Sequence, residues 1–216
     1  MIVIGAKGHA KEIVQIFSQL NECNNLYFFD NVSKDIPELF LSNFKVLRTF
    51  EDVERIFLKD NKFVLGLGGP QTRYKLSMKF QELGGFLESI ISPFAQIGDY
   101  DVNLGFGLNV MSYALIYNNV SIGEGSLINS SCSIHHDVTI GKYCEVSPGS
   151  RLLGNCIVGD FCQIGANAII MPGVRIGSNV IIGAGAVVTK DVSDNTLTIG
   201  IPARVIKTII PLSPNQ

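Results

Sequence analysis

The sequence lacks several features that mark common classes of protein. No apolar run approaches the ~18 residues that a membrane-spanning helix needs, and the opening M-I-V-I-G has no basic-then-apolar signal pattern. The five cysteines include no C-x-x-C pair, so neither a zinc site nor a redox motif is indicated. The formal net charge is only −2, which argues against a basic nucleic-acid surface. We therefore expect a cytoplasmic protein with no membrane span and no nucleic-acid partner.

The second half of the sequence contains a hexad repeat. Counting by sixes from Leu104 meets an aliphatic residue fifteen times in succession. These positions are Leu104, Val110, Ile116, Ile122, Ile128, Ile134, Ile140, Val146, Leu152, Val158, Ile164, Ile170, Ile176, Ile182 and Val188. The residue four positions after each aliphatic one is small or β-branched from Ala114 onward. Four of the five cysteines occupy this position, and we expect them to be small buried packing residues. An α-helix could not keep a period of six on one face, so the repeat predicts short strands.

Glycine reveals a larger unit within the repeat. It follows the aliphatic residue at every third hexad, namely after Leu104, Ile122, Ile140, Val158 and Ile176. Three hexads then close one turn of a three-sided parallel β-helix, whose successive turns pair as parallel strands ~4.8 Å apart. Residues 91–103, with Ile97 and Gly98 out of register, are predicted to form the junction and a first imperfect turn.

The first ninety residues follow a different pattern, in which expected strands alternate with expected helices. The strands are predicted at 2–5, 26–29 and 63–67, and the helices at 10–20, 51–58 and 71–83. This alternation predicts a small α/β domain with a Rossmann-like parallel sheet.

Ligands of such sheets bind at the carboxyl ends of the strands, beside helix N-termini. In this chain those ends carry G-A-K-G-H at 5–9, Asp30-Asn31, and G-G-P-Q-T-R at 68–73. The first segment is not a full dinucleotide motif, so an ordinary tight turn stays an alternative for it. Arg73 is expected to reach a phosphate, with a solvated helix residue as the alternative.

Two of the three histidines, His135 and His136, are adjacent within the repeat, and Asp137 follows them. They fall in the turn of a hexad, where side chains face outward, and a neighbouring carboxylate can orient an imidazole as a general base. Gly154 follows His136 by three hexads, one full turn of the coil, so its N–H is placed to stabilise an oxyanion. A solvated turn histidine, and a glycine needed only by its turn, remain the alternatives from the local pattern.

These motifs together resemble those of bacterial nucleotide-sugar N-acetyltransferases of the bacillosamine-pathway type, which are related to sialic acid O-acetyltransferases. The resemblance covers nearly the whole chain. It rests on the segments already described and on I-H-H-D-V-T-I-G at 134–141, S-P-G at 147–149, G-N at 154–155 and G-I-P-A-R at 200–204. It implies an α/β domain over 1–91, a left-handed parallel β-helix over 92–207 and a tail over 208–216. It also implies a homotrimer with active sites between subunits.

The resemblance further implies roles for single residues. His136 matches the base, Asp137 its acidic partner and Gly154 the oxyanion donor. The nucleotide-sugar contacts are Lys7, Gly8, His9, Asp30, Asn31 and Gly68, which Arg73 joins as the expected phosphate ligand. The residues that line acetyl-CoA are Glu145, Ala166 and Ala184. Three positions depart from the family pattern: Lys7 replaces a small residue, Asn31 stands where a second acid can occur, and Glu145 stands where a relative has histidine.

The implied reaction is acetyl transfer from acetyl-CoA to the amine of a nucleotide-linked amino-dideoxy sugar, with UDP as the expected nucleotide and no metal. Its product would serve the synthesis of a bacterial surface glycan or glycoprotein. One alternative is O-acetylation of sialic acid or another sugar hydroxyl by the same base. A β-helix carbonic anhydrase is a second, although it needs three metal-binding histidines. A non-catalytic trimeric sugar-binding module is the third.

Overall fold

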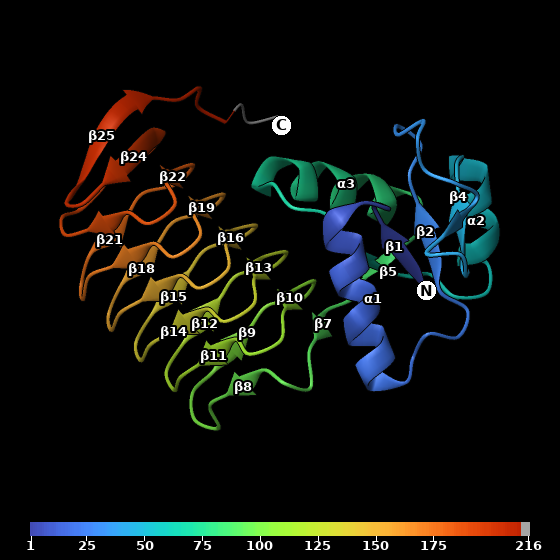
Figure 1. Ribbon diagram of the computed structural model, residues 1–216, viewed down its shortest axis with the longest axis horizontal. Helices are drawn as coiled ribbons and strands as arrows, with labels where there is room; N and C mark the ends of the chain where they lie inside the picture. The colour runs from blue at the N-terminus through green and yellow to red at the C-terminus, as the bar shows by residue number, and fades with distance from the viewer. Residues whose placement is uncertain (213–216) are drawn as a thin grey trace.

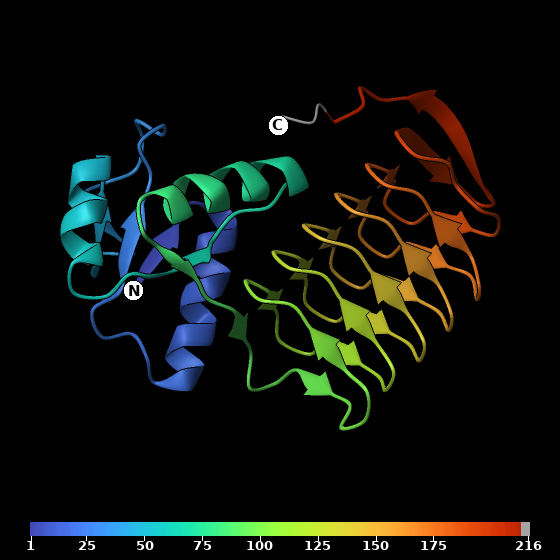
Figure 2. The same ribbon diagram turned by 180° about the vertical axis from the view of Figure 1, so that it is seen from behind.

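The computed structural model describes residues 1–212 and shows an α/β unit packed against one end of a long ladder of short strands (Figure 1). Figure 2 gives the reverse view, in which helix α3 (Pro70–Glu82) lies along the α/β unit with its first turn toward the ladder. In this part of the chain no helix has the length and apolar character to cross a membrane.

The α/β unit is built on one six-stranded sheet of order β3-β4-β2-β1-β5-β6. Its strands are β1 (Ile2–Ile4), β2 (Tyr27–Phe29), β3 (Leu39–Phe40), β4 (Phe44–Leu47), β5 (Lys62–Leu65) and β6 (Phe86–Leu87). All neighbours pair in parallel except β3 and β4. The predicted parallel α/β domain is thus confirmed. Strands β3, β4 and β6 were not predicted, because they are short and lie in a polar stretch or beside glycines.

Local chemistry explains where the helices of this unit begin and end. Helix α1 (Gly8–Leu20) ends at Asn21, which adopts a left-handed φ of 60°. Helix α2 (Phe50–Phe57) begins after Thr49, whose side chain accepts a hydrogen bond from the Asp52 N–H. Helix α3 begins at Pro70. Proline has no N–H, and this costs nothing in the first turn of a helix, where N–H groups have no partner within the helix. These helices cover the sheet and leave the carboxyl ends of its strands accessible.

The rest of the chain winds as a three-sided parallel β-helix, with one sheet on each side. The first side holds β7 (Ile90–Ile91), β10 (Asn109–Val110), β13 (Leu127–Ile128), β16 (Glu145–Val146), β19 (Gln163–Ile164) and β22 (Ile181–Ile182). The second holds β8 (Gln96–Ile97), β11 (Leu115–Ile116), β14 (Ser133–Ile134), β17 (Arg151–Leu152), β20 (Ile169–Ile170) and β23 (Val187–Val188). The third holds β9 (Asn103–Leu104), β12 (Ser121–Ile122), β15 (Thr139–Ile140), β18 (Ile157–Val158) and β21 (Arg175–Ile176).

The interior of this coil is the aliphatic stack that the repeat predicts. Fourteen of the fifteen hexad positions are buried, and the first, Leu104, is partly buried. Pairing joins each strand to the one three hexads later, as in Ile116 with Ile134. The four cysteines of the small-residue positions are buried free thiols, and burial raises the pKa of Cys132 to about 12. They therefore act as packing residues.

The two ends of the coil depart from the ideal repeat. Strand β7 at Ile90–Ile91 already pairs with β10, so the coil begins just before the expected boundary between 91 and 92. One additional residue between Ile97 and Leu104 accounts for the irregular first turn. At the far end an antiparallel hairpin of β24 (Thr196–Gly200) and β25 (Ala203–Thr208) closes the coil. Strand β25 includes the first residue of the tail expected over 208–216, of which residues 213–216 lie outside the described part.

The aliphatic stack should dominate the stability of the coil. Ile164 is fully buried, and truncating it leaves a cavity that its tightly paired neighbours cannot fill. We expect Ile164→Ala to lower the free energy of unfolding by about 2–5 kcal/mol, measured by urea unfolding at one fixed protein concentration. Leu58→Ala, at a side chain that is 88% exposed, should change it by no more than about 0.5 kcal/mol. If the two variants lost the same free energy of unfolding, the aliphatic stack would not be the main source of the stability of the coil.

Candidate active site

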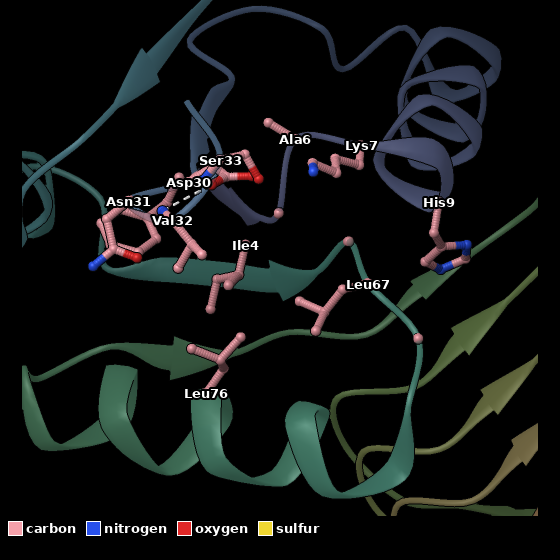
Figure 3. A pocket seen from close by; sticks show the side chains of 14 residues that line it. Ile4, Ala6, Lys7, His9, Asp30, Asn31, Val32, Ser33, Leu67 and Leu76 are labelled. Atoms are coloured by element: carbon pink, nitrogen blue, oxygen red, sulfur yellow. Dashed lines mark hydrogen bonds between the residues drawn. The ribbon is translucent and has the colours of Figure 1, made fainter. Parts of the chain in front are cut away.

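A cavity of about 320 Å³ opens at the carboxyl ends of β1, β2 and β5 (Figure 3). Its lining includes Lys7, His9, Asp30, Asn31 and Gly68, five of the seven residues predicted to contact a nucleotide sugar. A sixth, Gly8, starts helix α1, and a side chain built there would meet open space. The structure therefore gathers these segments, distant in sequence, at one edge of the sheet.

The wall of this cavity formed by residues 30–33 is held by hydrogen bonds. The Asp30 carboxylate accepts from the N–H groups of Val32 (3.0 Å) and Ser33 (2.8 Å). The Arg48 guanidinium donates to the carbonyls of Asp30 (2.7 Å), Ser33 (3.0 Å) and Ile36. Arg48 is a functional candidate that the sequence reasoning missed, because it follows a strand that was not predicted.

Two basic side chains of the first glycine turn lie in different environments. Lys7 is mostly exposed, and its Nζ lies 3.8 Å from Oδ1 of the exposed Asp35 carboxylate. An ion pair this long and this exposed is weak, so the ammonium of Lys7 is available to an anion. His9 is mostly buried, its Nδ1 lies 3.0 Å from Glu12 Oε2, and its Nε2 faces the Asn109 amide at 3.5 Å. Burial lowers the pKa of His9, although the hydrogen bond with Glu12 opposes this, so a neutral ring is favoured at neutral pH.

Arg73 requires a correction, because its side chain does not lie in the cavity. It is fully buried between the α/β unit and the coil. Its guanidinium donates to the carbonyls of Gly125 (2.9 Å) and Leu67 (2.9 Å) and to Asn109 Oδ1 (2.9 Å). Burial lowers the pKa of Arg73 to about 10, which still leaves it charged at neutral pH. Arg73 therefore joins the two units and, being fully buried, does not line the cavity.

Glu145 also has a partner within the chain. Its Oε2 accepts a hydrogen bond of 2.7 Å from the Gly69 N–H, and a Cβ on Gly68 would lie only 2.9 Å from the same oxygen. Gly68 lines the first cavity and Gly69 a second one, of about 220 Å³, between the start of α3 and the coil. The carboxylate thus fastens the glycine loop to the coil, and its contact with acetyl-CoA stays a prediction.

The predicted base lies in the turn between β14 and β15. His136 Nδ1 is 2.7 Å from Asp137 Oδ2, and the two side chains are 63% and 38% exposed. The pKa of Asp137 is lowered first by its hydrogen bond with His136 and then by one from Asn119. Asp137 itself has a φ of 62°, which lies in the left-handed region.

Gly154 lies directly over the His136 ring, as the spacing of three hexads predicts. A Cβ built on it would lie 2.5 Å from Cε1 and 2.7 Å from Nε2 of the imidazole, so any other residue there would force the ring to move. Within residues 1–212 the Gly154 N–H donates no hydrogen bond. His135 points elsewhere, with its ring 5.0 Å from that of Tyr117.

A single chain does not bring all of these residues together. The nucleotide-sugar candidates line a cavity whose walls include neither His136 nor Gly154. The α/β unit contacts the first side of the coil through Asn109 and Glu145, whereas His136 lies at the corner between the second and third sides. Ala166 and Ala184 stack at another corner, where Gly185 N–H donates to the Ala166 carbonyl. The predicted site residues therefore lie in separate places within a single chain. The described residues contain no group of three His, Cys, Asp or Glu placed to hold a metal ion.

Comparison with known proteins agrees with the division into an α/β unit and a hexapeptide coil. Residues 1–80 match the PglD N-terminal domain, and residues 119–154 and 155–190 match the bacterial transferase hexapeptide family of six repeats. Comparison with curated protein sequences returns no significant match.

Three solved structures cover almost the whole chain. PerB from Caulobacter crescentus, in complex with CoA and GDP-perosamine, is 30% identical, with a TM-score of 0.86 over 95% of this chain and 96% of that one. The acetyltransferase domain of PglB from Neisseria gonorrhoeae is 26% identical, and WeeI from Acinetobacter baumannii is 27% identical. Both have a TM-score of 0.84 over 95% of this chain and 98% of theirs.

Fold and repeat define the class as the hexapeptide-repeat acyltransferases, whose coil is the left-handed parallel β-helix that the resemblance implied. Within that class, the chain belongs to the family of nucleotide-sugar N-acetyltransferases that carry a PglD-type N-terminal domain.

The buried position of Arg73 leads to a test of its role. Lysine keeps the charge but cannot reproduce the forked donors, so several buried acceptors lose their partner. We expect Arg73→Lys to lower the free energy of unfolding by about 1–3 kcal/mol in chemical denaturation, whereas Lys75→Ala, exposed on the same helix, should be nearly neutral. A variant that kept its stability but lost affinity for a nucleoside diphosphate would restore the phosphate-binding role.

Proposed function

We propose that this protein transfers the acetyl group of acetyl-CoA to the amine of a nucleotide-linked amino-dideoxy sugar, with His136 as general base. The observation that carries the proposal is the His136–Asp137 pair beneath Gly154. Three elements of acyl transfer are combined there: a proton acceptor, a carboxylate that orients it and an unpaired backbone N–H.

The chemistry follows from the orientation of the imidazole. With its Nδ1–H donating to Asp137, His136 presents the lone pair of Nε2 to the substrate. That nitrogen accepts the proton of the sugar amine as the amine attacks the thioester carbonyl carbon. The Gly154 N–H donates to the oxyanion of the tetrahedral intermediate. The carbon–sulfur bond then breaks, the CoA thiolate leaves, and the product is an N-acetylated sugar.

The cavity of the α/β unit is the proposed nucleotide site. It opens beside the first turn of α1, which contains no acidic residue, and Lys7 stands at its edge with an available ammonium. A helix N-terminus of this kind favours phosphate. UDP is the nucleotide that the sequence resemblance favours, whereas the Caulobacter relative was crystallised with GDP-perosamine. Turnover with UDP- and GDP-linked amino sugars, compared side by side, decides between them.

We further propose a homotrimer in which the base of one subunit serves the cavity of its neighbour. Support comes from the separation of cavity and base in one chain and from the exposure of His136, 63% in the single subunit. A second subunit packed over that corner would shield the pair from bulk water and strengthen its electrostatic interactions.

Replacing the base should separate catalysis from folding. His136→Ala should lower kcat by about 10²–10⁴ with little change in stability, because the side chain lies in a turn outside the hydrophobic core. Release of the CoA thiol measures the rate, and calorimetry measures the binding of both substrates. His135→Ala is the matched control, because it removes the same residue type one position away and should stay within a few fold of the wild type. The reverse order of the two effects would mean that the register of the site is off by one residue.

The shared site can be tested by mixing two inactive variants. His136→Ala chains keep the cavity, and Asp30→Ala chains keep the base. When the two are co-expressed in equal amounts, about a quarter of the sites should combine an intact cavity with an intact neighbouring base. Activity near that fraction is expected in the mixture, and neither variant alone should show it. A mixture as inactive as its parents would place the whole site within one chain.

A further inference from the structure

The corner of the coil that carries His136 holds a row of residues in the left-handed conformation. Asn119, Asp137 and Asn155 have φ values of 56°, 62° and 63° and follow one another at intervals of three hexads. Asparagine and aspartate are the residues other than glycine that tolerate this conformation best. Asp137 is the one acid of the three, and it lies between the two amides along the row.

Asn119 contacts that acid directly. Its Nδ2 donates a hydrogen bond to Asp137 Oδ1, while Asp137 Oδ2 lies 2.7 Å from His136 Nδ1. The backbone of Asn119 is held in turn by a 3.0 Å hydrogen bond from its N–H to the Tyr100 carbonyl. Both carboxylate oxygens are therefore engaged, and the carboxylate cannot rotate without breaking one of the two contacts.

We propose that Asn119 is a positioning residue for the reaction, which holds the Asp137 carboxylate so that His136 keeps its proton on Nδ1 and its lone pair on Nε2. The proposal rests on the proposed function of His136 as the base. Neutral imidazole has two tautomers, and only the one protonated on Nδ1 offers Nε2 as a proton acceptor. An exposed carboxylate that can rotate freely selects this tautomer less well than a carboxylate whose second oxygen is held by another hydrogen bond, as Asn119 holds Oδ1 of Asp137.

The charge of Asp137 supports the same role. The hydrogen bonds from His136 and Asn119 both lower the pKa of Asp137 and so keep its carboxylate ionised. Asn119 donates only an N–H and has no charge of its own, so it fixes the carboxylate without neutralising it. No element of the α/β unit is needed for this chain of contacts, which runs along one corner of the coil.

Asn119→Gly is the sharpest test, because glycine adopts the left-handed conformation without strain and the turn should therefore fold unchanged. We expect kcat to fall about tenfold, the usual effect of losing one charge-assisted hydrogen bond, with the KM values of both substrates within about twofold. Nitrogen NMR of ¹⁵N-histidine-labelled protein reports the tautomer, and the chain has only three histidines. The His136 signals, assigned by their loss in His136→Ala, should move toward the form protonated on Nε2.

Asn195→Gly is the matched control. Asn195 has a φ of 57° and also makes a side-chain hydrogen bond between turns, accepting from Asn179 Nδ2 at 2.8 Å, at a corner without a histidine. This variant should keep both the wild-type kcat and the wild-type His136 tautomer. An Asn119→Gly variant with an unchanged tautomer would overturn the proposal, whatever its rate. Failure of the proposed function would look different, since His136→Ala would then remain active while the tautomer shift of Asn119→Gly could still be observed.

Discussion

The three-hexad register of the coil is the constraint on which the rest of the structure depends. Aliphatic side chains fill a narrow interior, and parallel pairing then fixes each residue above the one three hexads earlier. A slip by one residue would turn every core side chain outward, so the burial of the stack enforces the alignment. The alignment in turn sets Gly154 over His136 and Asn119 next to Asp137. The geometry of the proposed base is therefore a consequence of core packing.

The position of the proposed nucleotide cavity depends on a second set of contacts, between the α/β unit and the coil. Helix α3 is held there by Arg73 and by Tyr74, whose ring packs edge-on against those of Tyr143 and Phe161. Tyr143 and Phe161 have left-handed φ values of 49° and 57°, which are costly for bulky residues. Their rings stack on each other with centroids 5.8 Å apart, and both pack against Tyr74 of α3. The interface thus sets the cavity at one defined place along the coil.

The sequence reasoning succeeded where a signal was periodic or local. The hexad positions, the stacked glycine and the strand ends that line the cavity could all be found by counting and by turn chemistry. It was wrong about Arg73, because a basic residue in a first helical turn looks the same whether it faces solvent or a buried interface. It missed Arg48, whose partners are carbonyls of the loop after β2, and Asn119, whose partner is a carboxylate in the next turn of the coil.

The sequence by itself determined the coil, its register and the identity of the residues at its corners, because a solenoid makes contacts only between neighbours at a constant spacing. It also indicated the parallel α/β unit, since alternating strands and helices leave few arrangements. Only the tertiary structure decided which side of the coil packs against the α/β unit and which polar side chains form hydrogen bonds at that interface. Those outcomes depend on matching two surfaces from separate parts of the chain, such as Arg73 with Asn109 and Gly69 with Glu145. No spacing along the sequence encodes that match.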